Sequence, residues 1–127
     1  MRKQGVFLAA LLVGMAALVQ GCVVAAVGAG AGTAVYVMGE FKAYEARDLT
    51  TVYMATQKAM EQLQLNVTAK TKDAMSATTV GRDSADTKIT VKLSAAPEQT
   101  TKISIRVGTF GDETKSRLIY DQIKKNL

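Results

Sequence analysis

The chain divides into an uncharged, apolar first part and a second part in which apolar and polar residues alternate regularly. No charged residue occurs between Gly5 and Gly39, whereas charged side chains are spread over the remainder. In the second part the apolar residues recur first about every 3.6 positions, then every two, then every 3.6 again. The longer period is typical of a helix with one buried face, and the shorter one of a half-buried strand. The pattern predicts a folded domain over residues 34–127.

A strand and a helix are predicted first. Residues 34–44 are rich in Val and Tyr, which favours one strand, and Gly39 is a candidate for a bulge within it. Asp48 stands at the N-cap position of a helix that extends from Leu49 to about Gln62. The apolar face of this helix comprises Leu49, Val52, Tyr53, Met60 and Leu63. A buried core explains its methionine and tyrosine side chains better than a cofactor-binding motif does.

Four further strands are predicted where the period changes to two, at residues 65–69, 77–81, 88–93 and 102–107. The alternation is clearest in the last two. There the apolar positions are Ile89, Val91, Leu93, Ile103, Ile105 and Val107. The sequence SAAPEQ between these two segments contains turn-forming residues, so an antiparallel hairpin is predicted.

A second helix closes the domain. The segment GTFGDE is interpreted as a loop, and Asp112 within it is a second N-cap candidate. Leu118, Ile119 and Ile123 follow the helical period and are predicted to face the core, while Lys124 and Lys125 suit the negative end of the helix. The predicted fold class is α+β, a two-layer sandwich in the order β-α-β-β-β-β-α. Its sheet is antiparallel, and both helices cover the one apolar face.

The first 21 residues have the regions of a secretory signal peptide. Arg2 and Lys3 form the positive region, residues 6–19 form the apolar region, and the small Gly21 precedes Cys22. The apolar region is too short to span a bilayer comfortably as a helix. The order resembles the bacterial lipobox, in which the cysteine becomes the acylated first residue of the mature chain. The resemblance predicts a signal peptide over residues 1–21 and lipid attachment at Cys22.

Cys22 has two other interpretations. It is a core residue if the uncharged block forms one long, uncleaved helix, and it is a reactive thiol if a nearby cation stabilises the thiolate. No cationic residue or histidine is near it in the sequence, which disfavours the second interpretation. In sorted lipoproteins of Gram-negative bacteria, an aspartate after the cysteine retains the protein in the inner membrane. Here Val23 follows, so the resemblance implies the outer membrane, with the domain facing the periplasm.

Glycines at positions 28, 30 and 32 invite comparison with a nucleotide-binding loop. The dinucleotide fingerprint requires glycine where this chain has Thr33, and the phosphate-binding loop requires a Gly-Lys pair that is absent from this stretch. Nucleotide binding is therefore not predicted. Residues 22–33 are interpreted as a lipid-anchored, Gly/Ala-rich tether. The alternative is a segment that packs closely through the G-x-x-x-G pair of Gly28 and Gly32.

The composition excludes several classes of chemistry. The chain has no histidine and one cysteine, which excludes Ser-His-Asp catalysis, His-ligated metals and an intramolecular disulfide. No cofactor and no metal site are predicted. The formal net charge is +5, and Arg2 and Lys3 supply two of these charges, so removal of the signal peptide leaves +3. This charge is weak support for a polyanionic partner, and no nucleic acid is expected.

The strongest candidate for a binding site is a basic patch on the predicted hairpin. Lys88, Lys92, Lys102 and Arg106 occupy polar positions of its two strands, so they are predicted to share the open face of the sheet. Such a patch would suit an anionic envelope partner, such as lipid phosphates, peptidoglycan carboxylates or an acidic protein surface. The alternative is a solvated sheet face whose lysines discourage aggregation.

The loop before the last helix offers two weaker candidates. Asp112 and Glu113 resemble the paired carboxylates of hydrolases, but an N-cap and an ion pair between Glu113 and Arg117 at i, i+4 explain them better. Phe110 is either a contact residue or a plug at the base of the core, and the plug is favoured.

Two segments carry a resemblance to a known family, the strand sequence YVMGE at residues 36–40 and SIRVGTFGDE with the helix that follows it at residues 104–123. Together with Cys22 and the Gly/Ala-rich stretch, they resemble small Gram-negative lipoproteins known only as a domain of unknown function. The resemblance implies a location and a fold class but no activity. Gln64 departs from the pattern, because glycine is expected at this helix end, and fraying of the helix is predicted there.

The predicted function is that of a lipid-anchored envelope lipoprotein whose domain is a non-enzymatic binding or structural module. The alternative is a self-associating subunit of an outer-membrane assembly, joined through the glycine-rich stretch. An enzyme is the third choice, because the residue types that most catalysis uses are missing. The expected partners are the membrane, through the lipid on Cys22, and an envelope protein or anionic envelope component.

Overall fold

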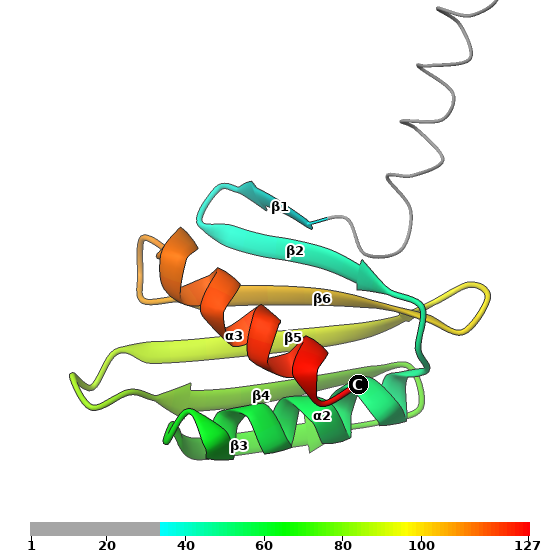
Figure 1. Ribbon diagram of the computed structural model, residues 1–127, viewed down its shortest axis with the longest axis horizontal. Coiled ribbons are helices and arrows are strands. Elements are labelled where there is room, and N and C mark those ends of the chain that lie inside the picture. Colours follow the sequence, from blue (N-terminus) through cyan, green and yellow to red (C-terminus); the bar gives the residue numbers. More distant parts are fainter. Residues whose placement is uncertain (1–33) are drawn as a thin grey trace, which may run out of the picture. The chain divides into compact units, whose positions relative to one another are not determined.

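The computed structural model of the protein describes residues 34–127. These residues form one six-stranded antiparallel sheet with two helices packed on it (Figure 1). The predicted α+β class is therefore confirmed. The predicted signal peptide over residues 1–21 and the predicted tether over residues 22–33 lie outside the described residues.

The strands follow one another across the sheet in the order β1-β2-β6-β5-β4-β3, and each neighbouring pair is antiparallel. The strands are β1 (Ala34–Val37), β2 (Glu40–Glu45), β3 (Asn66–Lys72), β4 (Ser76–Arg82), β5 (Lys88–Ala96) and β6 (Thr100–Val107), and the helices are α2 (Leu49–Gln62) and α3 (Glu113–Lys125). The predicted hairpin of β5 and β6 is confirmed, with Val91 opposite Ile105.

The prediction of a single strand over residues 34–44 is wrong, because the chain reverses in the middle of this segment. A two-residue turn at Met38 and Gly39 joins β1 to β2, so Val37 pairs with Glu40. Both turn residues have positive φ angles, 53° and 79°, as in the type I′ turn whose twist matches that of a hairpin. Gly39 therefore belongs to a turn and not to a bulge, and the element order is β-β-α-β-β-β-β-α.

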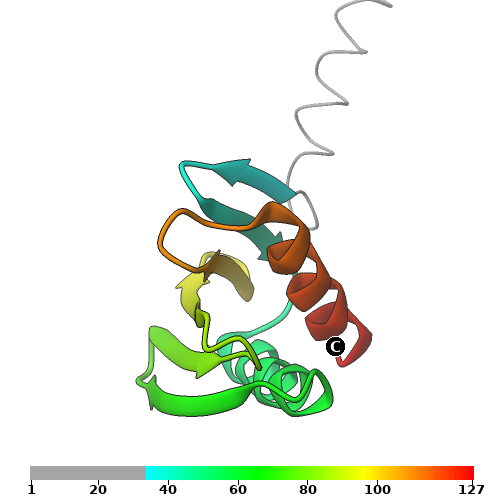
Figure 2. The ribbon, with the colours of Figure 1, turned by 90° about the vertical axis from the view of Figure 1, so that its left-hand side faces the viewer.

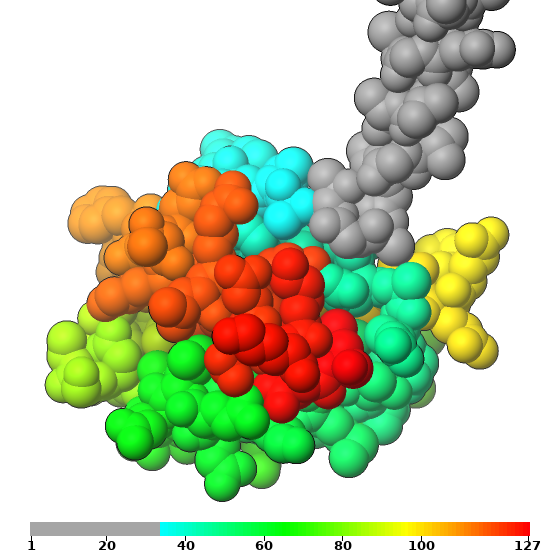
Figure 3. Space-filling view, viewed as in Figure 1, coloured from blue at the N-terminus to red at the C-terminus, as the bar shows by residue number. Residues whose placement is uncertain are grey.

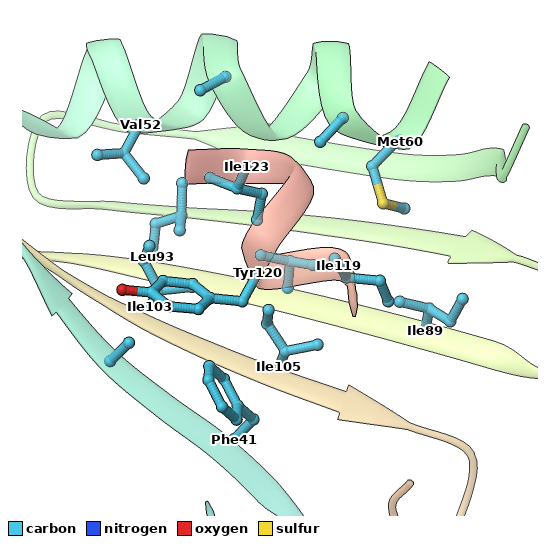
Figure 4. Close-up of a cluster of buried hydrophobic side chains, with 14 of the residues drawn as sticks. Phe41, Val52, Met60, Ile89, Leu93, Ile103, Ile105, Ile119, Tyr120 and Ile123 are labelled. Atoms are coloured by element: carbon cyan, nitrogen blue, oxygen red, sulfur yellow. The ribbon is translucent and has the colours of Figure 1, made fainter. Parts of the chain in front are cut away.

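Both helices cover the same face of the sheet, as predicted (Figure 2). The core between the two layers consists of the apolar residues that alternate along the strands and of the apolar stripes of the helices. It includes Phe41, Ile89, Leu93, Ile103, Ile105, Val52, Met60, Ile119 and Ile123 (Figure 4). A fully buried side chain of this size contributes about 1.5–3 kcal/mol through burial, so this layer is the main source of stability.

Helix α3 meets the sheet with a stripe that differs from the predicted one. Ile119 and Ile123 are buried as predicted, but the prediction for Leu118 is wrong, because 56% of its surface is exposed. The buried stripe runs through Ser116, Ile119, Tyr120 and Ile123, the spacing i, i+3, i+4, i+7 of one helical face. Leu118 lies beside this stripe, and Tyr120 takes its place against the Phe41 ring, 5.0 Å away between ring centroids.

Both predicted N-caps are confirmed. The Asp48 carboxylate accepts a hydrogen bond from the Thr51 N–H, and the Asp112 carboxylate accepts one from the Lys115 N–H. Each cap thereby satisfies an amide that the first turn of the helix leaves without a partner. The Thr51 hydroxyl and N–H also hold the pKa of the Asp48 carboxyl below its usual value.

The C-terminal end of α2 is closed by hydrogen bonds, so the predicted fraying at Gln64 is not observed. Gln64 has a φ of 57°, its N–H donates to the Glu61 carbonyl, and the Leu65 N–H donates to the Met60 carbonyl. These two bonds are those of the Schellman motif, in which glycine usually supplies the left-handed residue. The cost of glutamine at this position is therefore conformational strain of one residue.

Candidate binding face on the open side of the sheet

The side of the sheet opposite the helices carries mainly polar side chains. We call the outward-pointing residues of β2, β4, β5 and β6 the open face. It holds six cationic side chains and a single carboxylate, Glu40. The cationic residues are Lys42, Arg82, Lys88, Lys92, Lys102 and Arg106. The open face is therefore strongly basic although the whole chain is only mildly so.

The four residues of the predicted basic patch all lie on the open face. Cross-strand pairing places Lys92 opposite Ser104, Ser94 opposite Lys102, and Thr90 opposite Arg106. Three shallow depressions run along this face. The largest, of about 640 Å³, is lined by Arg82, Lys88, Arg106 and the loops next to them. Lys92 lines both of the others, one with Arg106 and one with Lys42 and Lys102.

The cations of the open face differ in their ion pairs. Arg82 pairs with Asp86 at 3.6 Å, and Lys42 and Arg106 each approach Glu40 at 3.8 Å. Within residues 34–127, Lys88, Lys92 and Lys102 make no ion pair with a carboxylate. These three lysines are therefore the residues of the patch that remain available to an anionic ligand.

Arg106 has a structural role that the sequence did not reveal. Its guanidinium donates hydrogen bonds to the Thr109 and Met38 carbonyl oxygens, each at 3.1 Å. Because Met38 lies in the β1–β2 turn and Thr109 in the β6–α3 loop, one side chain joins two loops. The prediction that Arg106 lies on the open face is confirmed, but this residue clamps the fold as well as adding charge.

The two loops that Arg106 joins are packed together through glycines. A Cβ atom on Gly39 would lie 2.9 Å from the Phe110 carbonyl oxygen, and one on Gly111 would overlap the Gly39 carbonyl oxygen and the Tyr36 hydroxyl. Gly111 also has a φ of 84°, which favours glycine. The two segments that carry the family resemblance, YVMGE and IRVGTFGDE, therefore contact each other.

Phe110 is not a plug of the core, because 93% of its surface is exposed. Its loop is held at Gly111 and Arg106, which leaves the Phe110 side chain projecting into solvent. Met38 in the neighbouring turn is 91% exposed. The fold thus presents two large apolar side chains at adjacent loop tips, and the prediction of a buried Phe110 is wrong.

The carboxylates near the last helix have structural partners. Asp112 is the N-cap, and Glu113 pairs with Arg117 at 3.0 Å, as the i, i+4 spacing predicts. The Tyr120 hydroxyl donates a hydrogen bond to the Glu45 carboxylate. The pKa of Tyr120 is raised, mainly because the phenol is buried and to a smaller extent because of this hydrogen bond. Throughout residues 34–127, every buried side-chain nitrogen or oxygen has a hydrogen-bond partner.

Within residues 34–127, no three His, Cys, Asp or Glu side chains lie together so that they could hold a metal ion. Neither α2 nor α3 combines the length and the apolar character needed to cross a membrane. Cys22, Gly28 and Gly32 lie outside the described residues, so lipid attachment and packing through the glycine pair stay predictions.

The chain was compared with the sequence models of known protein families. The model of a family described as "Protein of unknown function (DUF3568)" matches residues 5–126. The chain belongs to this family. The sequence resemblance to a domain of unknown function is thereby confirmed, although the DUF3568 description names neither a lipid anchor nor an activity. No curated protein matches the chain.

Two cations of the open face were missed by sequence reasoning. Lys42 alternates with the buried Phe41 and Ala43 on β2, so the period of two would have placed it outward once the β1–β2 turn was recognised. Arg82 lies opposite Lys88 at the end of β4. Its position depends on the register of β4 against β5, which the weak alternation of residues 77–81 does not determine.

Proposed function

We propose that the protein is a lipid-anchored lipoprotein of the outer membrane, and that its periplasmic domain is a non-enzymatic module that binds an anionic component of the envelope. The observation that carries the binding role is the charge of the open face. Lys88, Lys92 and Lys102 lie along one surface without an ion-pair partner among the described residues. Neighbouring unpaired cations raise the local concentration of anions and strengthen their capture.

The solvated-face alternative accounts for lysines on a sheet but not for their distribution. Lysines protect a sheet best at its edges, where backbone groups are unpaired. Lys88, Lys92 and Lys102 instead lie on β5 and β6, the two central strands. Their position in the middle of an uncovered face, beside shallow depressions, favours a binding surface.

The proposed lipid anchor rests on the sequence. A positive region, an apolar region and a small residue precede Cys22, and the residue after the cysteine is not aspartate. Metabolic labelling with a palmitate analogue tests the anchor. We expect label on the wild-type chain and none on Cys22→Ser, and equal labelling of the two proteins would disprove it.

Charge reversal tests the binding role. We expect the double variant Lys92→Glu/Lys102→Glu of the full chain to lose retention on isolated peptidoglycan sacculi or on vesicles of anionic phospholipid, whichever retains the wild type. Wild-type retention should weaken as salt is raised, because exposed charges are screened. The matched control is Lys58→Glu/Lys125→Glu, which changes the net charge equally on the exposed sides of the helices. Equal retention of both double variants would rule out the open face as the binding surface.

A further inference from the structure

We propose that the anionic partner of the open face is the phospholipid surface itself, and that Met38 and Phe110 insert into it. This inference rests on the proposed binding role of the open face and names its partner. It starts from an observation that the binding role does not use, the exposure of two large apolar side chains at one end of the sheet.

Met38 and Phe110 belong to loops that the fold holds side by side. Arg106 bonds to a carbonyl in each loop, and Gly39 and Gly111 allow the two backbones to touch. Figure 3 shows the orange loop before α3 protruding next to the cyan β1–β2 hairpin. The side chains of Met38 and Phe110 are 91% and 93% exposed, so both project into solvent from two loops that contact each other.

The apolar surface continues from the tip onto the outer side of the sheet edge. Val35 and Val37 of β1 are each 49% exposed. They pair with Lys42 and Glu40, so they point to the same side of the sheet as the open face. Contiguous exposed apolar surface on a small domain marks an interaction site more often than a chance exposure does.

Cations border this apolar tip. The largest depression of the open face reaches from Lys88 and Arg82 to Arg106 and Thr109, and Thr109 directly precedes Phe110. A surface that combines apolar tips with neighbouring lysines matches a lipid layer, which offers an apolar interior beneath anionic headgroups. Peptidoglycan carboxylates would satisfy the lysines but would leave Met38 and Phe110 in water.

The predicted anchor places a bilayer within reach of this surface. Twelve residues, 22–33, separate the described domain from the start of the mature chain, and twelve extended residues span at most about 40 Å. Tethering raises the effective concentration of the membrane at the domain. Shallow insertion of two side chains is then sufficient to orient the domain.

Tryptophan fluorescence tests the insertion directly, because the chain contains no tryptophan. The full-length Phe110→Trp protein is reconstituted into vesicles of phosphatidylethanolamine and phosphatidylglycerol, with and without bromine on the acyl chains. We expect brominated lipid to remove most of the emission of this variant. The matched control is Met54→Trp, on α2, where the native side chain is 65% exposed, and its emission should not change.

Charge dependence separates this inference from the proposed function. In the brominated vesicles, adding Lys88→Glu/Lys92→Glu to Phe110→Trp should restore the tryptophan emission. Replacing the lipid by brominated phosphatidylcholine alone, which has no net charge, should restore it as well. Equal quenching of the Phe110→Trp and Met54→Trp proteins, or quenching of neither, would overturn the insertion. If the emission is not quenched while the wild type is still retained on sacculi through Lys92 and Lys102, the proposed function stands and this inference fails. If charge reversal affects no retention at all, the proposed function fails.

Discussion

The two faces of the sheet are built from the same strands but differ in almost every physical property. Strand β6 shows the contrast within eight residues, since Ile103 and Ile105 are fully buried under the helices while Lys102 and Arg106 point outward. The covered face is apolar and close-packed, and the open face is basic and uncovered by any element among residues 34–127. The difference teaches that the apolar residues that stabilise the fold lie on one side of the sheet, which leaves the other side free for the binding role that we propose.

Arg106 is the exception that sharpens this division. It points outward with the lysines, but its hydrogen bonds join the β1–β2 turn to the β6–α3 loop. Arg82, whose guanidinium donates to the Asp86 carbonyl oxygen at 2.9 Å, is a second outward cation with a partner in the fold. Lys88, Lys92 and Lys102, by contrast, make no ion pair with a carboxylate within residues 34–127. Substitutions on the two faces should separate these contributions.

The largest expected effect lies on the covered face. We expect Ile105→Ala to lower the free energy of unfolding by about 2–5 kcal/mol, because it leaves a cavity in a fully buried core. Its outward neighbour Ser104→Ala should cost no more than about 1 kcal/mol, because it removes only the hydrogen bond from the Ser104 hydroxyl to the Glu40 carboxylate. Denaturant unfolding measures both, and similar losses for the two variants would contradict the assignment of stability to one face.

The junction of the two loops should give the next largest effect. Gly111→Ala places a Cβ atom onto the Gly39 carbonyl at a positive φ, whereas Gly108→Ala has a positive φ but meets only the Thr87 methyl at 3.5 Å. We expect Gly111→Ala to cost well over 1 kcal/mol, roughly twice the cost of Gly108→Ala. Thermal unfolding compares them. Equal costs would show that backbone strain alone matters, and that the close contact of the loops does not.

Alanine substitutions of Arg106 and Lys92 on the open face should differ in their effect on the free energy of unfolding. Arg106→Ala removes bonds to two carbonyls, and because its side chain is 39% exposed we expect a loss of only about 1 kcal/mol. Lys92→Ala should leave stability within about 0.5 kcal/mol while it weakens anion binding. Unfolding curves for the two proteins test this, and a destabilised Lys92→Ala would mean that the lysines also serve the fold.

The smallest effect concerns pH on the covered side. Burial and the hydrogen bond to Glu45 raise the pKa of Tyr120 above its ordinary value of 10.0, so the folded protein favours the protonated phenol. This contribution is present below about pH 10 and is lost as the pH rises above it. We expect the stability difference between wild type and Tyr120→Phe to shrink above pH 10. A difference that is constant up to pH 11 would contradict the raised pKa of Tyr120.

Most of the fold could be predicted because it depends on local periods. The alternation along residues 88–93 and 102–107 requires one buried face, and Asp48 and Asp112 mark the starts of two amphipathic stripes. The turn at Met38 was missed because the residues around it favour a strand, and methionine is not a typical residue at positive φ. Leu118 was misplaced because it lies one position from the buried stripe, and its local sequence does not distinguish the two.

The basic charge of the open face could be predicted from the sequence, but the contacts of Arg106 and the exposure of Phe110 could not. The same alternation that buries Ile103 and Ile105 places Lys102 and Arg106 outward, so the basic face follows from the sequence. The clamp at Arg106 could not be predicted, because its partner Met38 lies 68 residues away and is reached only through the order of the strands. The exposure of Phe110 likewise depends on how Gly111 packs on Gly39.

Cross-linking in cells tests the assignment of recognition to the open face most directly. A photoreactive residue replaces Thr90, which lines two depressions of the open face, or Met54 on the exposed side of α2. We predict adducts with an anionic envelope component from position 90, their loss when Lys92→Glu/Lys102→Glu is added, and none from position 54. Adducts that form equally from both positions, or that persist after charge reversal, would contradict the account.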